Sequence, residues 1–84
     1  QADGKLIERL SEFLDVVKGP PLPCDIPVTW EDRNTKLPQH VSIINETGGI
    51  IHASVQDGKV VEVPVSKMWN KRVLVYMRFR GITD

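Results

Sequence analysis

The first part of the chain has the spacing of an amphipathic helix. Within residues 3–18, apolar side chains recur at intervals of three and four residues and so fall on one stripe: Leu6, Leu10, Phe13, Leu14 and Val17. Asp3 is a capping residue at the start, and Gly19 with the prolines after it ends the pattern. The spacing therefore predicts a helix over residues 3–18.

From Ile26 onward the apolar period changes from helical spacing to alternation. Five segments have the composition of strands separated by turns: residues 26–30, 40–45, 49–55, 59–65 and 72–79. Asp57-Gly58 favours a tight turn between the third and fourth of them. We expect a single small domain, residues 1–84, of the α+β class. In it, one N-terminal helix packs on a small meandering antiparallel sheet of about five strands, spanning residues 26–80.

Charge and cysteine content exclude several classes of protein. Eleven basic and eleven acidic residues cancel, and no basic block is present to neutralise a phosphate backbone, so we expect no nucleic-acid partner. No apolar run has the length of a membrane span, and no signal peptide is visible. The single cysteine, Cys24, excludes an internal disulfide and a cysteine-rich metal site.

Both histidines of the chain fall in the predicted hairpin of residues 40–55. If its loop is Thr47-Gly48, His40 and His52 point to opposite faces of the sheet. If the loop is Glu46-Thr47-Gly48, the two histidines are diagonal neighbours on one face, within about 7–8 Å. Gly48 suits the left-handed residue that ends a three-residue loop. The spacing permits a shared face without requiring one.

A histidine pair on one face has a chemical and a structural interpretation. One imidazole can deprotonate a thiol while a second polar group holds its ring in the useful tautomer. Alternatively, each is a half-exposed strand residue with its hydrogen bonds satisfied. Two imidazoles are too few for a closed zinc site, and the spacing places no third ligand, so we expect no metal and no cofactor.

Other polar and aromatic residues have structural explanations beside functional ones. Trp30 and Trp69 could stack on sugars, but packing is favoured for Trp30 and a solvated turn for Trp69. Arg78 and Arg80 could bind a carboxylate, although an exposed sheet face has the same alternation. Asp25 is expected to cap or brace its turn rather than to catalyse.

The order of several short motifs resembles one family. The succession "LPCDIPVTW", "HVSII", "IIHAS", "VVE", "MWNKR" and "MRFRG" covers about residues 22–81. It is similar to the C-terminal part of the NlpC-type cysteine peptidases, which are bacterial cell-wall endopeptidases of the papain-like clan. The most similar subgroup is found with phage tails and phage-like gene-transfer particles. The motif order also favours the three-residue loop, with both imidazoles on one face.

The resemblance implies a function and roles for both histidines. His40 matches the catalytic histidine of the family, and His52 matches the polar residue that orients it. The family cleaves amide bonds of peptidoglycan stem peptides, without a metal. The implied location is the bacterial cytoplasm or a phage-like particle, with action at the cell wall.

The sequence departs from the family at the nucleophile. The family's cysteine begins a helix well upstream of the histidine strand, where the helix terminus lowers its pKa. Cys24 lies instead in a proline-flanked turn where the family has glycine, and we predict a structural role for it. We therefore expect a fragment or a truncated relative of the peptidase, inactive alone and able to self-associate through exposed sheet. The alternative is a free-standing, non-catalytic module that binds a cell-wall ligand or builds a phage-like particle.

Overall fold

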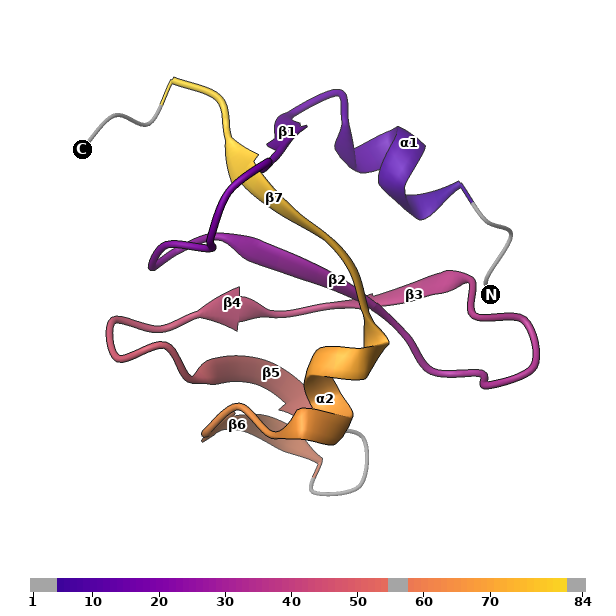
Figure 1. Ribbon diagram of the computed structural model, residues 1–84, viewed down its shortest axis with the longest axis vertical. Coiled ribbons are helices and arrows are strands. Elements are labelled where there is room, and N and C mark those ends of the chain that lie inside the picture. Colours follow the sequence, from indigo (N-terminus) through magenta and orange to yellow (C-terminus); the bar gives the residue numbers. More distant parts are fainter. Residues whose placement is uncertain (1–4, 55–57, 82–84) are drawn as a thin grey trace.

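The computed structural model describes residues 5–54 and 58–81 (Figure 1). Seven strands and two short helices follow one another in this part of the chain. Their bounds are α1 Leu6–Leu10, β1 Leu14–Val16, β2 Ile26–Trp30, β3 Pro38–Val41, β4 Ile43–Ile44, β5 Ile50–Ser54, β6 Lys59–Val63, α2 Lys67–Arg72 and β7 Val73–Phe79. The strands form two antiparallel sheets, with the orders β1-β7-β2-β3 and β4-β5-β6.

The predicted fold class is wrong. The described part of the chain is mostly β, with 41% strand and 15% helix, and it has two sheets instead of one helix on a single five-stranded sheet. The five predicted strand regions do form strands, and "SKMWNK" contributes a short helix, α2, capped by the Ser66 hydroxyl on the Trp69 N–H. The errors lie at the N-terminal helix and in the division of one strand between two sheets.

The predicted helix over residues 3–18 is wrong beyond Leu10. The chain turns after α1 and enters β1, which pairs with β7 through Leu14 and Phe79. Arg80 holds the turn, because its guanidinium donates to the carbonyls of Ser11 and Glu12. Pairing with β7 gives residues 14–16 a hydrogen-bonded ladder and also buries Leu14. The strand therefore buries the same apolar side chain that a helix would bury. The predicted cap, Asp3, lies outside the described residues.

One polar residue divides the predicted strand of residues 40–45. β3 and β4 follow each other directly along the chain and are separated only by Ser42. The Ser42 N–H donates to the Pro27 carbonyl at 3.2 Å, and the Ile44 N–H donates to the Asp25 carbonyl at 2.9 Å. The other edge of β4 pairs with β5. This segment therefore joins the two sheets, which lie one below the other in Figure 1.

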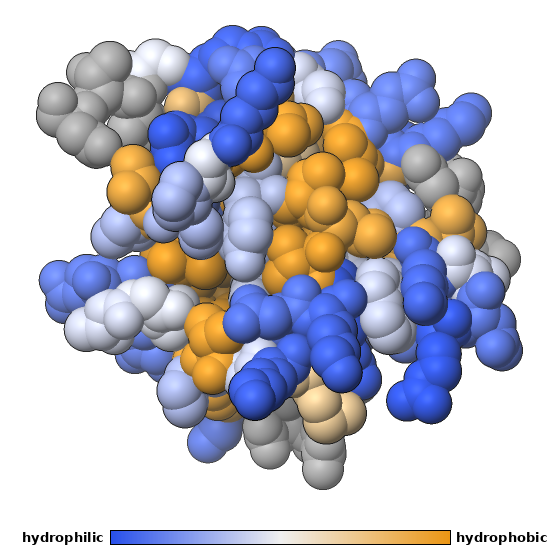
Figure 2. Space-filling view, in the orientation of Figure 1, coloured by the Kyte–Doolittle hydropathy of each residue, from blue (hydrophilic) through white to orange (hydrophobic). Residues whose placement is uncertain are grey.

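The main core lies between α1 and the four-stranded sheet. Its buried members come from β1, β2 and β7 and are Leu14, Ile26, Val28 and Met77. Apolar side chains of α1 pack against them. The core is small, and Figure 2 shows apolar side chains reaching the surface across the middle of the molecule. Among the described residues, neither helix has the length and apolar character to span a bilayer.

Candidate functional site

The register of the β4–β5 hairpin decides where the histidines point. Ile44 pairs with Ile50, and the Asn45 N–H donates to the Gly49 carbonyl at 3.0 Å, so the loop is residues 46–48. Gly48 has φ +87°, the left-handed conformation that such a loop needs at its end. The prediction of a three-residue loop is confirmed.

This register brings the two imidazoles together. Their ring centroids are 5.8 Å apart, and the ring planes meet at 84°, edge to face. Both side chains are half-buried, so the pair is held by the sheet and still open to solvent. The two histidines therefore share one face, as diagonal neighbours on adjacent strands do.

The hairpin that carries His52 is fixed by its glycines and by Asn45. The Asn45 Oδ1 accepts from the Gly49 N–H at 2.7 Å, and its Nδ2 donates to Glu62 on β6 at 2.7 Å. A Cβ on Gly49 would lie 2.9 Å from the Val63 carbonyl oxygen and 2.8 Å from Asn45 Nδ2. Only glycine allows this close approach, which sets the position of β5 against β6.

Cys24 is far from the histidines. Thr29 is the residue opposite His40, and Cys24 lies five residues before Thr29, in the turn that precedes β2, so the separation along the chain is roughly 15 Å. The thiol is exposed, and the N–H of Cys24 donates to the Ile44 carbonyl at 2.8 Å. Cys24 cannot hydrogen-bond to His40 in this arrangement.

The backbone of Cys24 has the conformation of a glycine. Its φ is +75°, Pro23 precedes it, and the Asp25 N–H donates to the Leu22 carbonyl at 3.0 Å. These features are those of a type II turn, whose third position favours glycine. A Pro-Gly-Asp sequence would therefore adopt the geometry of this turn without backbone strain.

Asp25 braces that turn, as its position predicted. Its carboxylate is 1% exposed and accepts from Arg78 Nε and Nη2, both at 2.8 Å, and from the Leu22 N–H at 2.7 Å. The Arg78 hydrogen bonds lower the pKa of Asp25, and burial only partly opposes them. Arg78 therefore binds a carboxylate of its own chain, which ties the "LPCD" turn to the "MRFRG" strand.

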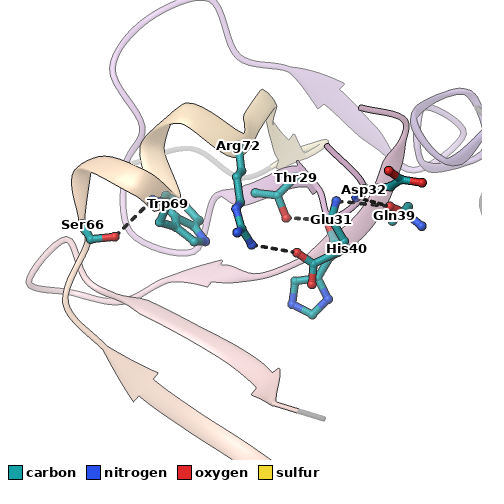
Figure 3. A network of polar contacts seen from close by, with 8 residues as sticks. All are labelled: Thr29, Glu31, Asp32, Gln39, His40, Ser66, Trp69 and Arg72. Carbon is teal, nitrogen blue, oxygen red and sulfur yellow. Dashed lines mark hydrogen bonds and ion pairs between the residues drawn. The ribbon is translucent and has the colours of Figure 1, made fainter. Parts of the chain in front are cut away.

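A second polar network holds the end of β2 beside His40 (Figure 3). Arg72 reaches from α2 to Glu31 at 3.3 Å, and its guanidinium lies 5.5 Å from the Trp30 ring centroid. The Gln39 Oε1 accepts the N–H groups of Glu31 and Asp32. Trp30 is half-buried and packs against cations, in agreement with the structural interpretation of this residue.

Comparisons with family models, curated proteins and solved structures found no match. Within residues 5–54 and 58–81, no three His, Cys, Asp or Glu side chains gather in a group that could hold a metal ion.

Sequence reasoning missed one polar residue of this face. Ser42 is 3% exposed and has an inward position between His40 and Ile44. The signal was a small polar residue at an inward position of "HVSII", which the apolar pattern gave no reason to examine. The Asp25–Arg78 ion pair was also not predictable as a pair, since 53 residues separate the partners.

Proposed function

We propose that His40 and His52 are the base and the orienting residue of an NlpC-type cysteine peptidase site acting on peptidoglycan stem peptides. The observation that carries the proposal is the edge-to-face contact of the two rings at 5.8 Å on one face of the hairpin. A base needs a neighbour that fixes its tautomer, and in this proposal the second imidazole would do so. His40 would take the proton of a thiol, and His52 would hold the imidazolium that forms.

Two further features support the resemblance to this family. The left-handed conformation of Cys24 is the one that the family's glycine would adopt without strain. The "LPCD" and "MRFRG" motifs, which are distant in sequence, contact each other through Asp25 and Arg78. Motifs that hold a fold together are expected to occur together and in a fixed order.

The proposed chemistry needs a thiol that these 84 residues do not place at the site. Cys24 is the one cysteine of the sequence, and it lies before β2, roughly 15 Å along the chain from the residue opposite His40. We therefore propose a fragment or truncated relative of the peptidase that does not hydrolyse peptides alone. A thiol from outside these residues would complete the site.

An exposed apolar face supports the view that a packing partner is needed. The face of the β4-β5-β6 sheet opposite His52 carries Ile43 and Val60, which are 43% and 67% exposed, and Val41 at the end of the adjoining β3 is 41% exposed. Ile43 is paired with Ile51, and Val60 with Ala53, so the patch is continuous across three strands. Soluble monomers rarely leave such a patch open, and we expect self-association of the isolated chain through it.

The same patch favours the second candidate, a non-catalytic binding or structural module. In that case the patch would bind a partner, and the histidine contact would be a packing feature. The two proposals differ in the site that a stem peptide contacts. A peptidase half-site predicts contact at His40 and His52, whereas a binding module predicts contact at Val41, Ile43 and Val60.

The test is a titration of the isotope-labelled chain with a synthetic stem peptide that contains its D-configured residues, followed by NMR. We expect the imidazole resonances of both histidines to shift, and an all-L peptide of the same composition is the control. A parallel incubation, analysed by mass spectrometry, is expected to show no cleavage by the chain or by its His40→Ala variant.

Each outcome bears on a separate part of the proposal. Imidazole resonances that stay unchanged while the apolar patch responds would replace the peptidase site with the binding module. Cleavage that depends on His40 would contradict the claim that the chain is inactive alone, and would bring Cys24 back as the candidate nucleophile.

A further inference from the structure

The Ser42 hydroxyl is the one buried side-chain polar atom without a hydrogen-bond partner in the described part of the chain. Its residue is 3% exposed, so water does not replace the missing partner freely. Buried hydroxyls in folded proteins are nearly always paired, and an exception calls for an explanation. An alanine would fill this position without the free-energy cost of desolvating an unpaired hydroxyl.

The strand register places this hydroxyl next to the histidine pair. Burial alternates along the segment, with His40, Ser42 and Ile44 on the inner side and Val41 and Ile43 outside. Ile44 pairs with Ile50 and Ile43 pairs with Ile51. β4 begins at Ile43, and one further step of this register would set Ser42 opposite His52. Residues opposite each other in an antiparallel pair have Cβ atoms about 4.5–5.5 Å apart.

His52 has a chemical need that this hydroxyl can meet. An orienting imidazole can present a chosen nitrogen to His40 only if its own tautomer is fixed, and a hydrogen bond on its other nitrogen fixes it. A serine hydroxyl can donate to or accept from an imidazole nitrogen, and rotation about one side-chain bond gives it three staggered positions.

We propose that Ser42 is a positioning residue, whose hydroxyl hydrogen-bonds the His52 ring and selects the nitrogen that His52 presents to His40; its catalytic meaning rests on the proposed function. The site would then be a relay of three side chains on adjacent strands. Ser42 holds His52, and His52 holds His40. Ser42 contacts no substrate in this arrangement.

The competing explanation is that the hydroxyl pairs only with a buried water or with the backbone. The Ser42 backbone already bonds to Pro27, because its N–H donates to that carbonyl at 3.2 Å. Loss of the hydroxyl would then leave the His52 ring unaffected. The tautomer of His52 therefore separates the two explanations, because a merely structural hydroxyl has no influence on it.

The experiment compares imidazole tautomers in the wild-type chain and in Ser42→Ala, by long-range nitrogen–proton NMR at a pH where both rings are neutral. We expect the His52 tautomer ratio to change about threefold or more, the equivalent of one ordinary hydrogen bond. Ser42→Cys keeps the size of the side chain but has only a weak hydrogen-bond donor. Its His52 tautomer ratio is expected to lie between those of the wild type and Ser42→Ala. Ser42→Cys also supplies a second variant if alanine perturbs folding.

Thr29→Val is the matched control. Thr29 is also buried, at 2% exposure, and its hydroxyl donates to the His40 carbonyl at 3.4 Å instead of to a ring. Its removal is expected to leave the His52 tautomer ratio unchanged. An unchanged ratio in both Ser42→Ala and Ser42→Cys would overturn the proposal.

The result is independent of the test of the proposed function. A changed tautomer with no response to the stem peptide would keep the relay and refute the peptidase site. A response to the stem peptide with an unchanged tautomer would keep the peptidase site and refute the relay.

Discussion

The replacement of Asp25 by asparagine breaks an ion pair that connects the turn before β2 to strand β7. Asp25 is nearly inaccessible and receives two charged hydrogen bonds from Arg78, each 2.8 Å long. Removal of one partner of a buried pair costs about 3–5 kcal/mol. The Arg78 side chain is 34% exposed and can be partly hydrated, so we expect the lower end, about 3 kcal/mol.

This loss is large for so small a domain. At roughly 0.05–0.15 kcal/mol per residue, a chain of 84 residues has a total stability of about 4–13 kcal/mol. A loss of 3 kcal/mol would lower Tm by roughly 12 °C or more. Urea unfolding, followed by tryptophan fluorescence, measures the difference directly.

The exposed Asp15–Arg80 pair provides a matched control. It also joins an aspartate to an arginine of the last strand, at 3.0 Å, but its aspartate side chain is 65% exposed. Because exposed pairs contribute about 0–1 kcal/mol, Asp15→Asn is expected to have little effect. The reasoning would be refuted if Asp25→Asn destabilised the protein no more than Asp15→Asn.

The same pair predicts the direction of the pH dependence. The pKa of Asp25 is lowered from its ordinary 3.8 by the Arg78 hydrogen bonds. A carboxylate whose pKa is lower in the folded state contributes its full stability above the unfolded pKa. That contribution is lost as the pH falls through the folded pKa. The free energy of unfolding of the wild type should therefore fall as the pH drops below about 4, and Asp25→Asn should show a flatter profile there.

Substitutions at Cys24, Gly49 and Ser66 test the local geometry by urea unfolding at neutral pH. Cys24→Gly should stabilise the protein by about 1 kcal/mol, because φ +75° suits glycine, whereas Cys24→Ala should be nearly neutral. Gly49→Ala should cost about 1–3 kcal/mol, because its Cβ would meet the Val63 carbonyl oxygen at 2.9 Å. Gly19→Ala, with nothing within 4 Å, is its control, and equal effects would contradict the steric argument. Ser66→Ala should cost about 1 kcal/mol through loss of the α2 cap, and no change would show that the cap is dispensable.

The part of the fold that the sequence predicted well depends on local chemistry. The hairpin loop of residues 46–48 was predicted from the motif order, and Gly48 suited the left-handed position that ends such a loop; the shared face of His40 and His52 came with it. The five strand regions likewise followed from composition and alternation. In each case neighbouring residues determine the structure.

The part that failed depends on contacts between distant residues. The pattern of residues 3–18 satisfies a helix, but Leu14 is buried equally well in a strand once β7 is beside it. Arg80 supports the strand, because its hydrogen bonds to the carbonyls of Ser11, Glu12 and Leu14 join residues that are 66 or more positions apart. The local sequence pattern does not predict such a contact. The division of one strand at Ser42 likewise depends on contacts with residues that are distant in the sequence.

The central place of β7 has a consequence for how the protein is made. β7 lies between β1 and β2 in the four-stranded sheet, yet the ribosome synthesises it after both of them. The pairing of Leu14 with Phe79 closes a loop of more than sixty residues. Contacts of this range slow folding and leave apolar strands uncovered until they form. The four-stranded sheet can therefore close only after β7 has left the ribosome, and until then β1 and β2 lack the strand that lies between them.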